Sequence, residues 1–478
     1  MIVIALCIVF LLGFSCINKI AGHLPALAKI GLAFLVGIGI ETIFMFIFDL
    51  IGIRFTGMRL IAVSIVCIGL INFKAIMNII KHRATINIRI PQQFYKTYFK
   101  NINLTWLFFI IITGFLIYAS MSKSLYWPTS AYDNVAGYDL MGKVMGIEGR
   151  IRNSLFEINK APILGSHNRL VYPPLTAGAF AFCYLFKMST SKLMTSLLLL
   201  FFAVAFYGLL RVITNRTTAI IALFFTIITP EFYAFSSLST TNIPFAIYAS
   251  LGMICLLIWQ HTGRRSDLYL AAILIALSSW TRSEGIVFDF TVFLFLLFHS
   301  IKKKSWKDFI PISAILFSTF IVWNIFVRLS FKADSIVFIM HPFWDSAKFS
   351  AIVTWVKNLM TSTGLYGITF YAFFVLIGLN LIYAIFKRTF KEGYDWSFLA
   401  VLLTTLFLYT FLYYQMDNSK MDPLDLMMSA SYKRGLFAFI PAIWVYIFTS
   451  RIVNTTFGYL NRYINLGEAQ SSLMSKSN

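Results

Sequence analysis

The chain has 478 residues, of which 59% are hydrophobic and 12% are charged, whereas about a quarter of the residues in an average soluble domain are charged. This composition excludes a soluble domain, because apolar runs close to the ~20 residues that cross a bilayer recur along the chain. The net charge is +21, from 40 basic and 19 acidic residues. In a membrane protein, this excess indicates basic cytoplasmic loops and contact with anionic headgroups rather than nucleic-acid binding.

The apolar runs are continuous rather than alternating, so we expect an all-α polytopic membrane protein and not a β-barrel. The first three predicted spans are Ile2–Ile17, Leu27–Leu50 and Met58–Ile80. The segment 81–100 that follows has five basic residues and no acid, which places it in the cytoplasm. The next predicted span, Leu104–Met121, therefore leaves the cytoplasm.

A large extracytoplasmic loop is expected from 122 to 192. Its apolar stretch Tyr172–Phe186 is short, and two arrangements were weighed for it. If it crossed the membrane, basic clusters such as Arg264–Arg265 and Lys302–Lys304 would face outside. The charge rule therefore favours an amphipathic or half-inserted helix that lies at the membrane surface and begins at Pro173.

The remaining predicted spans alternate across the membrane without conflict. They are Ala219–Thr229, Ile243–Trp259, Leu268–Trp280, Ile286–Phe298, Phe309–Arg328, Gly367–Phe386, Ser397–Tyr414 and Leu436–Phe448, after Leu193–Leu210. This gives about thirteen spans, with the N-terminus outside and the C-terminus inside. Beyond the large loop, the segments expected outside are Glu231–Asn242, Thr281–Gly285, Phe331–Tyr366 and Gln415–Arg434.

We expect three regions along the chain. Residues 1–103 carry three spans and a basic cytoplasmic linker, residues 104–452 form a larger transmembrane region that includes the loop 122–192, and residues 453–478 form a polar cytoplasmic tail.

Two acids stand out in the polar stretch WPTSAYDNVAGYDL at the start of the large loop. Asp133 and Asp139 are six residues apart, a spacing that does not put them on one helical face. They therefore need not act as a pair. A lone carboxylate in a partly dry site suits a general base acting on a hydroxyl. The alternative for either residue is a helix N-cap or a surface charge.

A second candidate lies in the sequence SSWTRSEG, between two short predicted spans. Arg282 and Glu284 are costly so close to the membrane unless they are paired or used. Arg282 could hold a phosphate through charge-assisted hydrogen bonds. The alternative is a structural contact between these two side chains.

A third candidate precedes the last predicted span, in the sequence SYKRG. Lys433 and Arg434 are adjacent cations on the outside, against the usual charge distribution. An anion bound there would explain them, and the alternative is that both side chains extend to lipid headgroups.

No metal or organic cofactor is expected. His167 and His341 are isolated, and no spacing typical of a metal site occurs. Three acids of the last outer loop, Asp417, Asp422 and Asp425, leave a divalent cation as an open alternative.

Taken in order, these pieces resemble the GT-C superfamily of integral-membrane glycosyltransferases. The likeness is to the branch with protein O-mannosyltransferases, the aminoarabinose transferases of lipid A and the Rgt-type sugar transferases. The matching pieces, in chain order, are the acidic loop YDNVAGYDLMGKVMGIEG, the Pro-Pro-Leu after Tyr172, the basic residue in WTRSEG and the basic residues in YKRGLFAFIP. The resemblance covers roughly Leu104 to Phe448.

The resemblance implies that a loop aspartate acts as base on the acceptor. Asp133 is the better match for this base, and Asp139 is the second choice. If Asp133 is the base, Asp139 is a supporting residue, together with Tyr172 and Glu284. It also implies that Arg282, Lys433 and Arg434 bind the lipid phosphate. The chain departs from the pattern at Asn242, where relatives often have an acid, and in the number of spans before the loop.

The implied function is transfer of a sugar, with inversion, from a polyprenyl-phosphate donor to an extracytoplasmic acceptor. The acceptor would be an envelope glycolipid such as lipopolysaccharide, a cell-envelope polysaccharide or a protein. The location would be the bacterial inner membrane, with the site facing the periplasm, among membrane lipids.

Two other functions were weighed: a transporter or lipid flippase, and an O-antigen-type polymerase or ligase. Against a transporter, no repeat or matched pair of broken spans is visible in the sequence. A polymerase would place its largest outer loop late in the chain. The glycosyltransferase hypothesis alone predicts that loop 122–192 packs against 281–285 and 431–435.

Overall fold

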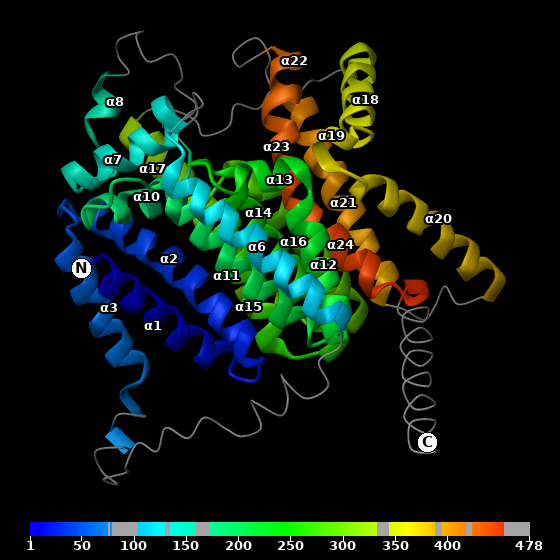
Figure 1. Cartoon of the computed structure of the whole chain (residues 1–478), viewed down its shortest axis with the longest axis horizontal. Helices are drawn as coiled ribbons and strands as arrows, with labels where there is room; N and C mark the ends of the chain where they lie inside the picture. The colour runs from blue at the N-terminus through cyan, green and yellow to red at the C-terminus, as the bar shows by residue number, and fades with distance from the viewer. Residues whose placement is uncertain are drawn as a thin grey trace, which may run out of the picture.

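The protein is an all-helical bundle, seen here as a computed structural model (Figure 1). The structure describes residues 1–74, 77–78, 104–129, 134–158, 172–331, 344–387, 394–416 and 423–453. Within these ranges, nine helices are long and apolar enough to cross a membrane. The predicted class, an all-α polytopic membrane protein, is confirmed, while the number of spans stays a prediction.

Each predicted span coincides with a helix. The helices are α1 (Ile2–Ala21), α2 (Ala26–Leu50), α3 (Gly57–Ile71), α6 (Leu104–Tyr126), α11 (Lys192–Leu210), α12 (Arg216–Ile228), α14 (Asn242–Thr262), α15 (Arg265–Ser279), α16 (Ile286–Lys303), α17 (Phe309–Phe331), α20 (Thr369–Lys387), α21 (Tyr394–Gln415) and α24 (Ile440–Thr449).

Several of these helices differ from the prediction in length; α3, for example, ends at Ile71, whereas the predicted span continued to Ile80. Helix α16 runs on to Lys303, beyond the short span expected, because basic residues in its last turn suit the negative end of the helix dipole. Helix α24 begins late, because the chain before it forms α23 (Lys433–Gly435) and a 3₁₀ turn, η5 (Leu436–Ala438).

Small residues let the N-terminal helices pack closely on the rest of the bundle. A Cβ added at Gly31 of α2 would lie 2.2 Å from the backbone nitrogen of Ala205 in α11, and one at Gly208 of α11 would lie 2.2 Å from that of Ala28. Glycines at helix contacts are typical of membrane proteins, where close backbone approach supplies much of the packing energy. The three N-terminal helices are thus in direct contact with the remainder of the bundle.

Helix α14 is the centre of the bundle. Every residue from Asn242 to Trp259 is buried, and the helix contacts α11, α15, α21 and α24. A helix that is apolar on all sides lies in a protein core or in lipid, and the neighbours of α14 show that it is enclosed by protein. Its first residue, Asn242, therefore lies inside the bundle at one end.

The large loop carries short helices: a π-helical turn η1 (Asn134–Tyr138), α7 (Asp139–Glu148), α8 (Ser154–Ile158) and α10 (Leu175–Leu185). Helix α10 follows Pro173 and Pro174, close to where a helix was expected. All of its residues from Leu175 to Cys183 are buried in the protein, and whether the helix is half-inserted in the membrane stays a prediction. The reason for the burial is close packing on α7: a Cβ at Gly142 would lie 2.5 Å from the Cβ of Phe180, and one at Gly146 would lie 2.9 Å from that of Tyr184.

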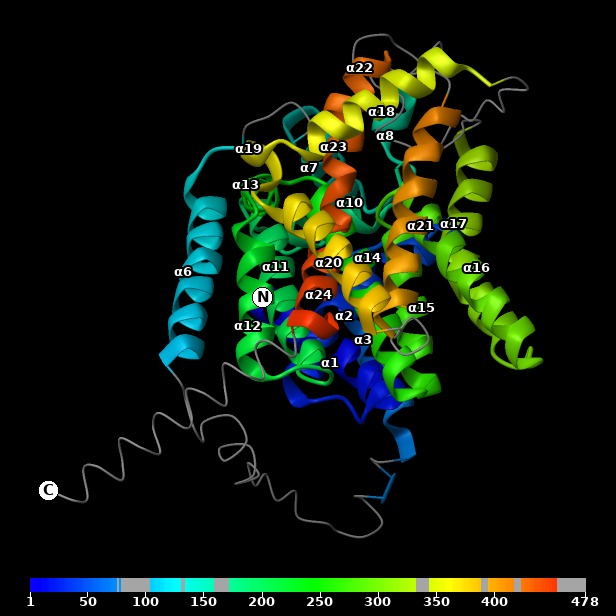
Figure 2. The ribbon, with the colours of Figure 1, turned by 90° about the vertical axis from the view of Figure 1, so that its right-hand side faces the viewer.

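The segments expected outside the membrane gather at one end of the bundle, which we call the outer end. Figure 2 shows there α7, α10, α13 (Pro230–Phe235), α18 (Ser346–Met360), α19 (Thr363–Tyr366), α22 (Leu424–Leu426) and α23. Between α22 and α23 lies a π-helical segment, η4 (Met427–Tyr432). Contacts agree with this grouping, since Arg152 of the large loop pairs with Asp49 at the end of α2, with 2.9 Å between Nε and Oδ2.

The opposite end, which we call the inner end, holds the turns that the charge rule placed together. His23, in the turn between α1 and α2, contacts Asp267 of α15 at 2.7 Å, and Thr262 donates to the same carboxylate at 2.8 Å. Arg265 pairs with Asp308 just before α17. The predicted turns thus share an end of the bundle as the charge rule requires.

Candidate active site

The centre of the candidate site is the tight bend between α15 and α16. A 3₁₀ turn, η3 (Ser283–Gly285), joins the two helices. A Cβ at Gly285 would lie 2.6 Å from the Cα of Ser279, so only glycine fits there. The Ser279 hydroxyl also donates to Asp289 in the first turn of α16. These contacts fix the bend and direct the Arg282 side chain into the protein.

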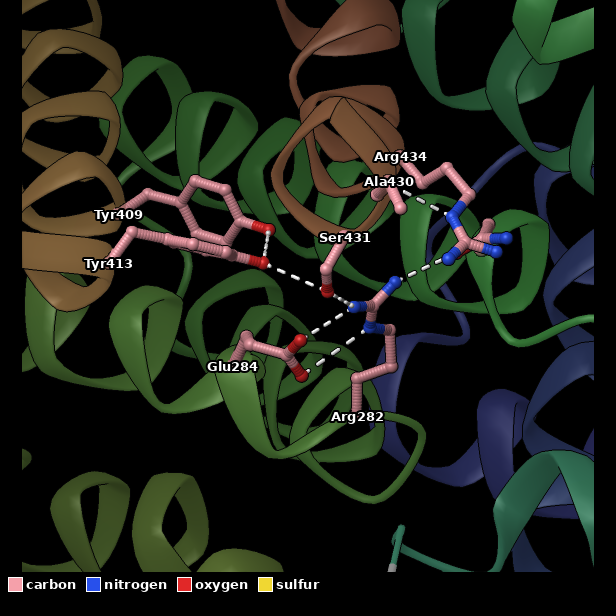
Figure 3. A network of polar contacts seen from close by, with 8 residues as sticks. Arg282, Glu284, Tyr409, Tyr413, Ala430, Ser431 and Arg434 are labelled. Atoms are coloured by element: carbon pink, nitrogen blue, oxygen red, sulfur yellow. Dashed lines mark hydrogen bonds and ion pairs between the residues drawn. The ribbon is translucent and has the colours of Figure 1, made fainter. Parts of the chain in front are cut away.

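Arg282 is the node of a buried polar network (Figure 3). Its Nη2 and Nε donate to the two oxygens of Glu284 at 2.5 and 3.4 Å. Its Nη1 donates to Asn242 at 2.7 Å, and Nη2 also donates to Ser431 at 3.2 Å. Arg282 is only 2% exposed and Glu284 only 4%. Arg282 and Glu284 therefore form the ion pair that was the alternative to phosphate binding by Arg282.

Helix α21 completes this network. The Tyr413 hydroxyl donates to Ser431 at 3.2 Å, and the Tyr409 hydroxyl lies 3.2 Å from that of Tyr413 (Figure 3). We call these six residues the Arg282 network: Arg282, Glu284, Asn242, Ser431, Tyr409 and Tyr413. Four separate parts of the sequence thus meet in one network around Arg282.

The network keeps Arg282 charged. Burial by itself opposes the charged form, but the Glu284 carboxylate and the nearby Tyr172 and Tyr409 outweigh burial and raise the pKa of Arg282 well above its usual value. The site therefore holds a fixed positive charge and a fixed negative charge side by side in a water-poor environment, where electrostatic interactions are strong.

Tyr172 links the large loop to this network. The Arg282 guanidinium lies 5.7 Å from the centre of the Tyr172 ring, a cation–π geometry. Tyr172 in turn meets Tyr138 edge-on, with ring centres 5.6 Å apart. Burial raises the pKa of the Tyr172 phenol well above its usual value, and the Glu284 carboxylate adds to this shift. Tyr172 is therefore a neutral phenol at physiological pH, not a base.

The predicted contact between the large loop and the bend is present, and the bend in turn contacts segment 431–435. The large loop meets the bend through Tyr172 on Arg282, and the Leu175 nitrogen donates to the Trp280 carbonyl at 3.0 Å. Arg282 then joins the bend to Ser431. Segments 122–192, 281–285 and 431–435 thus form one connected assembly at the outer end.

The cations of the last outer segment lie directly after Ser431. The Lys433 ammonium contacts Glu231 of α13 at 3.1 Å. The Arg434 Nε donates to the Ala430 carbonyl at 2.9 Å (Figure 3). Both side chains are partly exposed, in contrast to Arg282. They are therefore accessible to an anion at the outer end.

Of the two acids of the large loop, the structure describes Asp139 but not Asp133. Asp139 begins α7 and accepts hydrogen bonds from Tyr184, at 2.7 Å, and from Ser191. Ser191 lies 2.8 Å from Ser239, so Asp139 joins the loop to the segments before α11 and α14. Asp133 lies outside the described residues, and its role as base stays a prediction.

No metal site is found in the part of the chain that the structure describes: no three His, Cys, Asp or Glu residues gather there as a metal ion would require. Asp425 accepts a hydrogen bond from Trp355 at 2.9 Å. The two other acids of the divalent-cation alternative, Asp417 and Asp422, lie outside the described residues, as do His167 and His341.

Several residues of the site were not found from the sequence. Tyr409 and Tyr413 lie inside a predicted span, where their spacing of four residues, which puts them on one helical face, was the only available signal. Ser431 begins the motif SYKRG, but nothing in the sequence indicates its contact with Arg282. Asn242 was noted only as a departure from relatives, whereas its carboxamide oxygen accepts from Arg282.

Comparison with known proteins gives one result for this region. A family model described as dolichyl-phosphate-mannose-protein mannosyltransferase matches residues 173–325. The matched segment begins just before α10, ends within α17 and includes Arg282 and Glu284. No curated protein and no solved structure matches the chain.

Proposed function

We propose that the chain, a membrane glycosyltransferase of the GT-C superfamily that uses a polyprenyl-phosphate sugar donor, transfers this sugar at the outer end of the bundle. The observation that carries the proposal is the meeting of three outer segments on Arg282, next to the accessible cations Lys433 and Arg434. An outer-end site suits a lipid-linked donor, which reaches it from within the membrane.

The reaction is a single displacement. Asp133 accepts the proton of the acceptor hydroxyl while the hydroxyl oxygen attacks the anomeric carbon of the sugar. The bond between that carbon and the phosphate oxygen breaks, and polyprenyl phosphate leaves with the bonding electrons. One attack from the opposite face inverts the anomeric configuration.

The leaving phosphate needs positive charge where its own negative charge develops. Lys433 and Arg434 supply it next to the accessible outer surface, and the fixed charge of Arg282 lies behind them. Preorganised cations in a water-poor site stabilise such a charge far better than water does. Asp139, Tyr172 and Glu284 support the site by holding the loop and the bend in place.

The acceptor is an extracytoplasmic hydroxyl of an envelope glycolipid, a polysaccharide or a protein, and the outer end faces the periplasm of a bacterial inner membrane. The sidedness rests on the charge rule, which places the basic segment 81–100 in the cytoplasm.

Mass spectrometry of lipid-linked sugars in cells with and without the gene tests this proposal. Without the gene, a sugar phosphate on a polyprenyl lipid should accumulate, and one sugar should be missing from the envelope glycans. The mass of the accumulated lipid then identifies the donor. Unchanged lipid-linked sugars together with unchanged glycans would contradict the proposal.

A further inference from the structure

Arg282 has little hydrogen-bonding capacity left for a ligand. A guanidinium group has five N–H donors in a fixed fork. Among the described residues, four of these are used: one on Nε and one on Nη2 by Glu284, the other on Nη2 by Ser431, and one on Nη1 by Asn242. A single N–H on Nη1 remains, which is too few for the two-pronged grip by which arginine usually holds a phosphate.

Exchanging Glu284 for a phosphate would also be unfavourable. The Glu284 side chain is 6% exposed and that of Arg282 3%. If Arg282 turned to a phosphate, the Glu284 carboxylate would stay buried without its counter-charge, and a buried unpaired charge is strongly destabilising. Arg282 is therefore committed to its protein partners.

Ser431 connects this committed charge to the accessible cations. Its hydroxyl oxygen accepts from both Arg282 and Tyr413, each at 3.2 Å. It lies in the π-helical segment η4, which runs directly into Lys433 and Arg434. π-helical turns are rare and often occur at functional sites. The position of Ser431 thus determines where the backbone that carries Lys433 and Arg434 begins.

Further contacts hold the same short segment. The Tyr366 hydroxyl donates to the Lys433 carbonyl at 2.6 Å. A Cβ at Gly435 would lie 1.6 Å from the Tyr409 hydroxyl, so the backbone there is pressed against a member of the Arg282 network. The backbone of segment 431–435 is therefore fixed at three points, while the side chains of Lys433 and Arg434 stay accessible.

We infer that Arg282 is a positioning residue: through its hydrogen bond to Ser431 it sets the segment whose Lys433 and Arg434 contact the lipid phosphate. This inference rests on the proposed function and assigns different roles to its three cations: Arg282 positions the segment, and Lys433 and Arg434 contact the phosphate. Ser431 is the residue through which Arg282 acts, and Glu284 and Asn242 hold Arg282 in the orientation that reaches Ser431.

Binding of undecaprenyl phosphate to the full-length protein in lipid nanodiscs tests the inference, because this leaving group does not depend on which sugar is transferred. Ser431→Ala removes the link and keeps every charge. It should weaken binding about tenfold, the effect of losing one buried hydrogen bond to a charged group. Ser431→Thr keeps the hydroxyl and should restore most of the affinity.

Ser429→Ala is the matched control. Ser429 lies in the same π-helical segment, but among the described residues its hydroxyl donates to the nearby Leu426 carbonyl, at 3.3 Å and exposed. The affinity of the Ser429→Ala variant for undecaprenyl phosphate should equal that of the wild type. Arg282→Lys should lose about as much affinity as Ser431→Ala, and the double variant should lose no more, because both changes break the same link.

The outcomes separate the inference from the proposed function. If Ser431→Ala binds like the wild type while Arg282→Lys loses affinity, Arg282 contacts the phosphate itself and the inference is wrong. Additive losses in the double variant would contradict it as well. If the wild type does not distinguish undecaprenyl phosphate from undecaprenol, the proposed function fails and the inference falls with it. Melting temperatures of all variants identify any loss that is due to unfolding.

Discussion

The two ends of the bundle each hold an arginine bound to a carboxylate by two contacts, yet the pairs differ in burial and in the number of segments that they connect. At the outer end, the side chains of Arg282 and Glu284 are 3% and 6% exposed, whereas those of Arg265 and Asp308 at the inner end are 50% and 33% exposed. The outer pair joins four parts of the sequence, and the inner pair joins only two helix ends. Burial and convergence, not the presence of an ion pair, distinguish the end at which we propose that the sugar is transferred.

The inner end also has an intermediate case. Asp267 is buried, with 2% of its side chain exposed, while its partner His23 is 28% exposed. Thr262 shares the carboxylate. The basic partners of the three carboxylates are increasingly exposed, at 3% for Arg282 on Glu284, 28% for His23 on Asp267 and 50% for Arg265 on Asp308. We therefore expect the effect of disrupting each contact to decrease in that order.

The largest effect is expected for Glu284→Gln. The change leaves the Arg282 charge buried beside a neutral amide, and breaking a buried ion pair in this way costs about 3–5 kcal/mol. Unfolding of the purified protein in detergent or lipid measures this loss, and undecaprenyl phosphate binding should fall with it. Stability equal to that of the wild type would mean that water reaches this pair.

A smaller effect is expected for His23→Ala. Asp267 keeps its hydrogen bond from Thr262 but loses its second partner, and leaving one buried acceptor poorly satisfied costs about 1–3 kcal/mol. The same unfolding measurement applies. Because the contact lies at the inner end, transfer activity at permissive temperature should stay at the wild-type level, and a selective loss of activity would break the division between the two ends.

The smallest effect is expected for Asp308→Asn, the inner-end counterpart of Glu284→Gln. Exposed ion pairs contribute little because water and salt screen them. Neither the unfolding midpoint nor the transfer activity should change measurably. A loss comparable to that of Glu284→Gln would show that burial does not govern these pairs.

The sequence was sufficient for the helices and for their grouping at the two ends. Continuous apolar runs predicted each long helix, and the distribution of basic residues placed the turns around Arg265 and Lys302–Lys304 on the same side of the membrane. These features depend on local composition and on the charge rule, both of which can be read along the chain.

The site could be predicted only in part. The motifs around Arg282 and Arg434 were recognised, but the partners of Arg282 were not, because Asn242 and Ser431 lie 40 and 149 residues away in the sequence. Such contacts depend on how α14 and α21 pack, which no single segment encodes. The complete burial of helix α10 could not be predicted for the same reason: its packing against α7 through Gly142 and Gly146 is tertiary.

Turnover of the Asp133→Asn variant tests the central claim most directly. The protein is reconstituted in lipid vesicles with the donor identified by mass spectrometry, and its transfer rate is compared with those of the wild type and Asp308→Asn. We expect Asp133→Asn to fold and bind donor normally but to transfer sugar about 10²–10⁴ times more slowly, the usual contribution of a general base, while Asp308→Asn keeps the full rate. Full activity in Asp133→Asn would contradict the account.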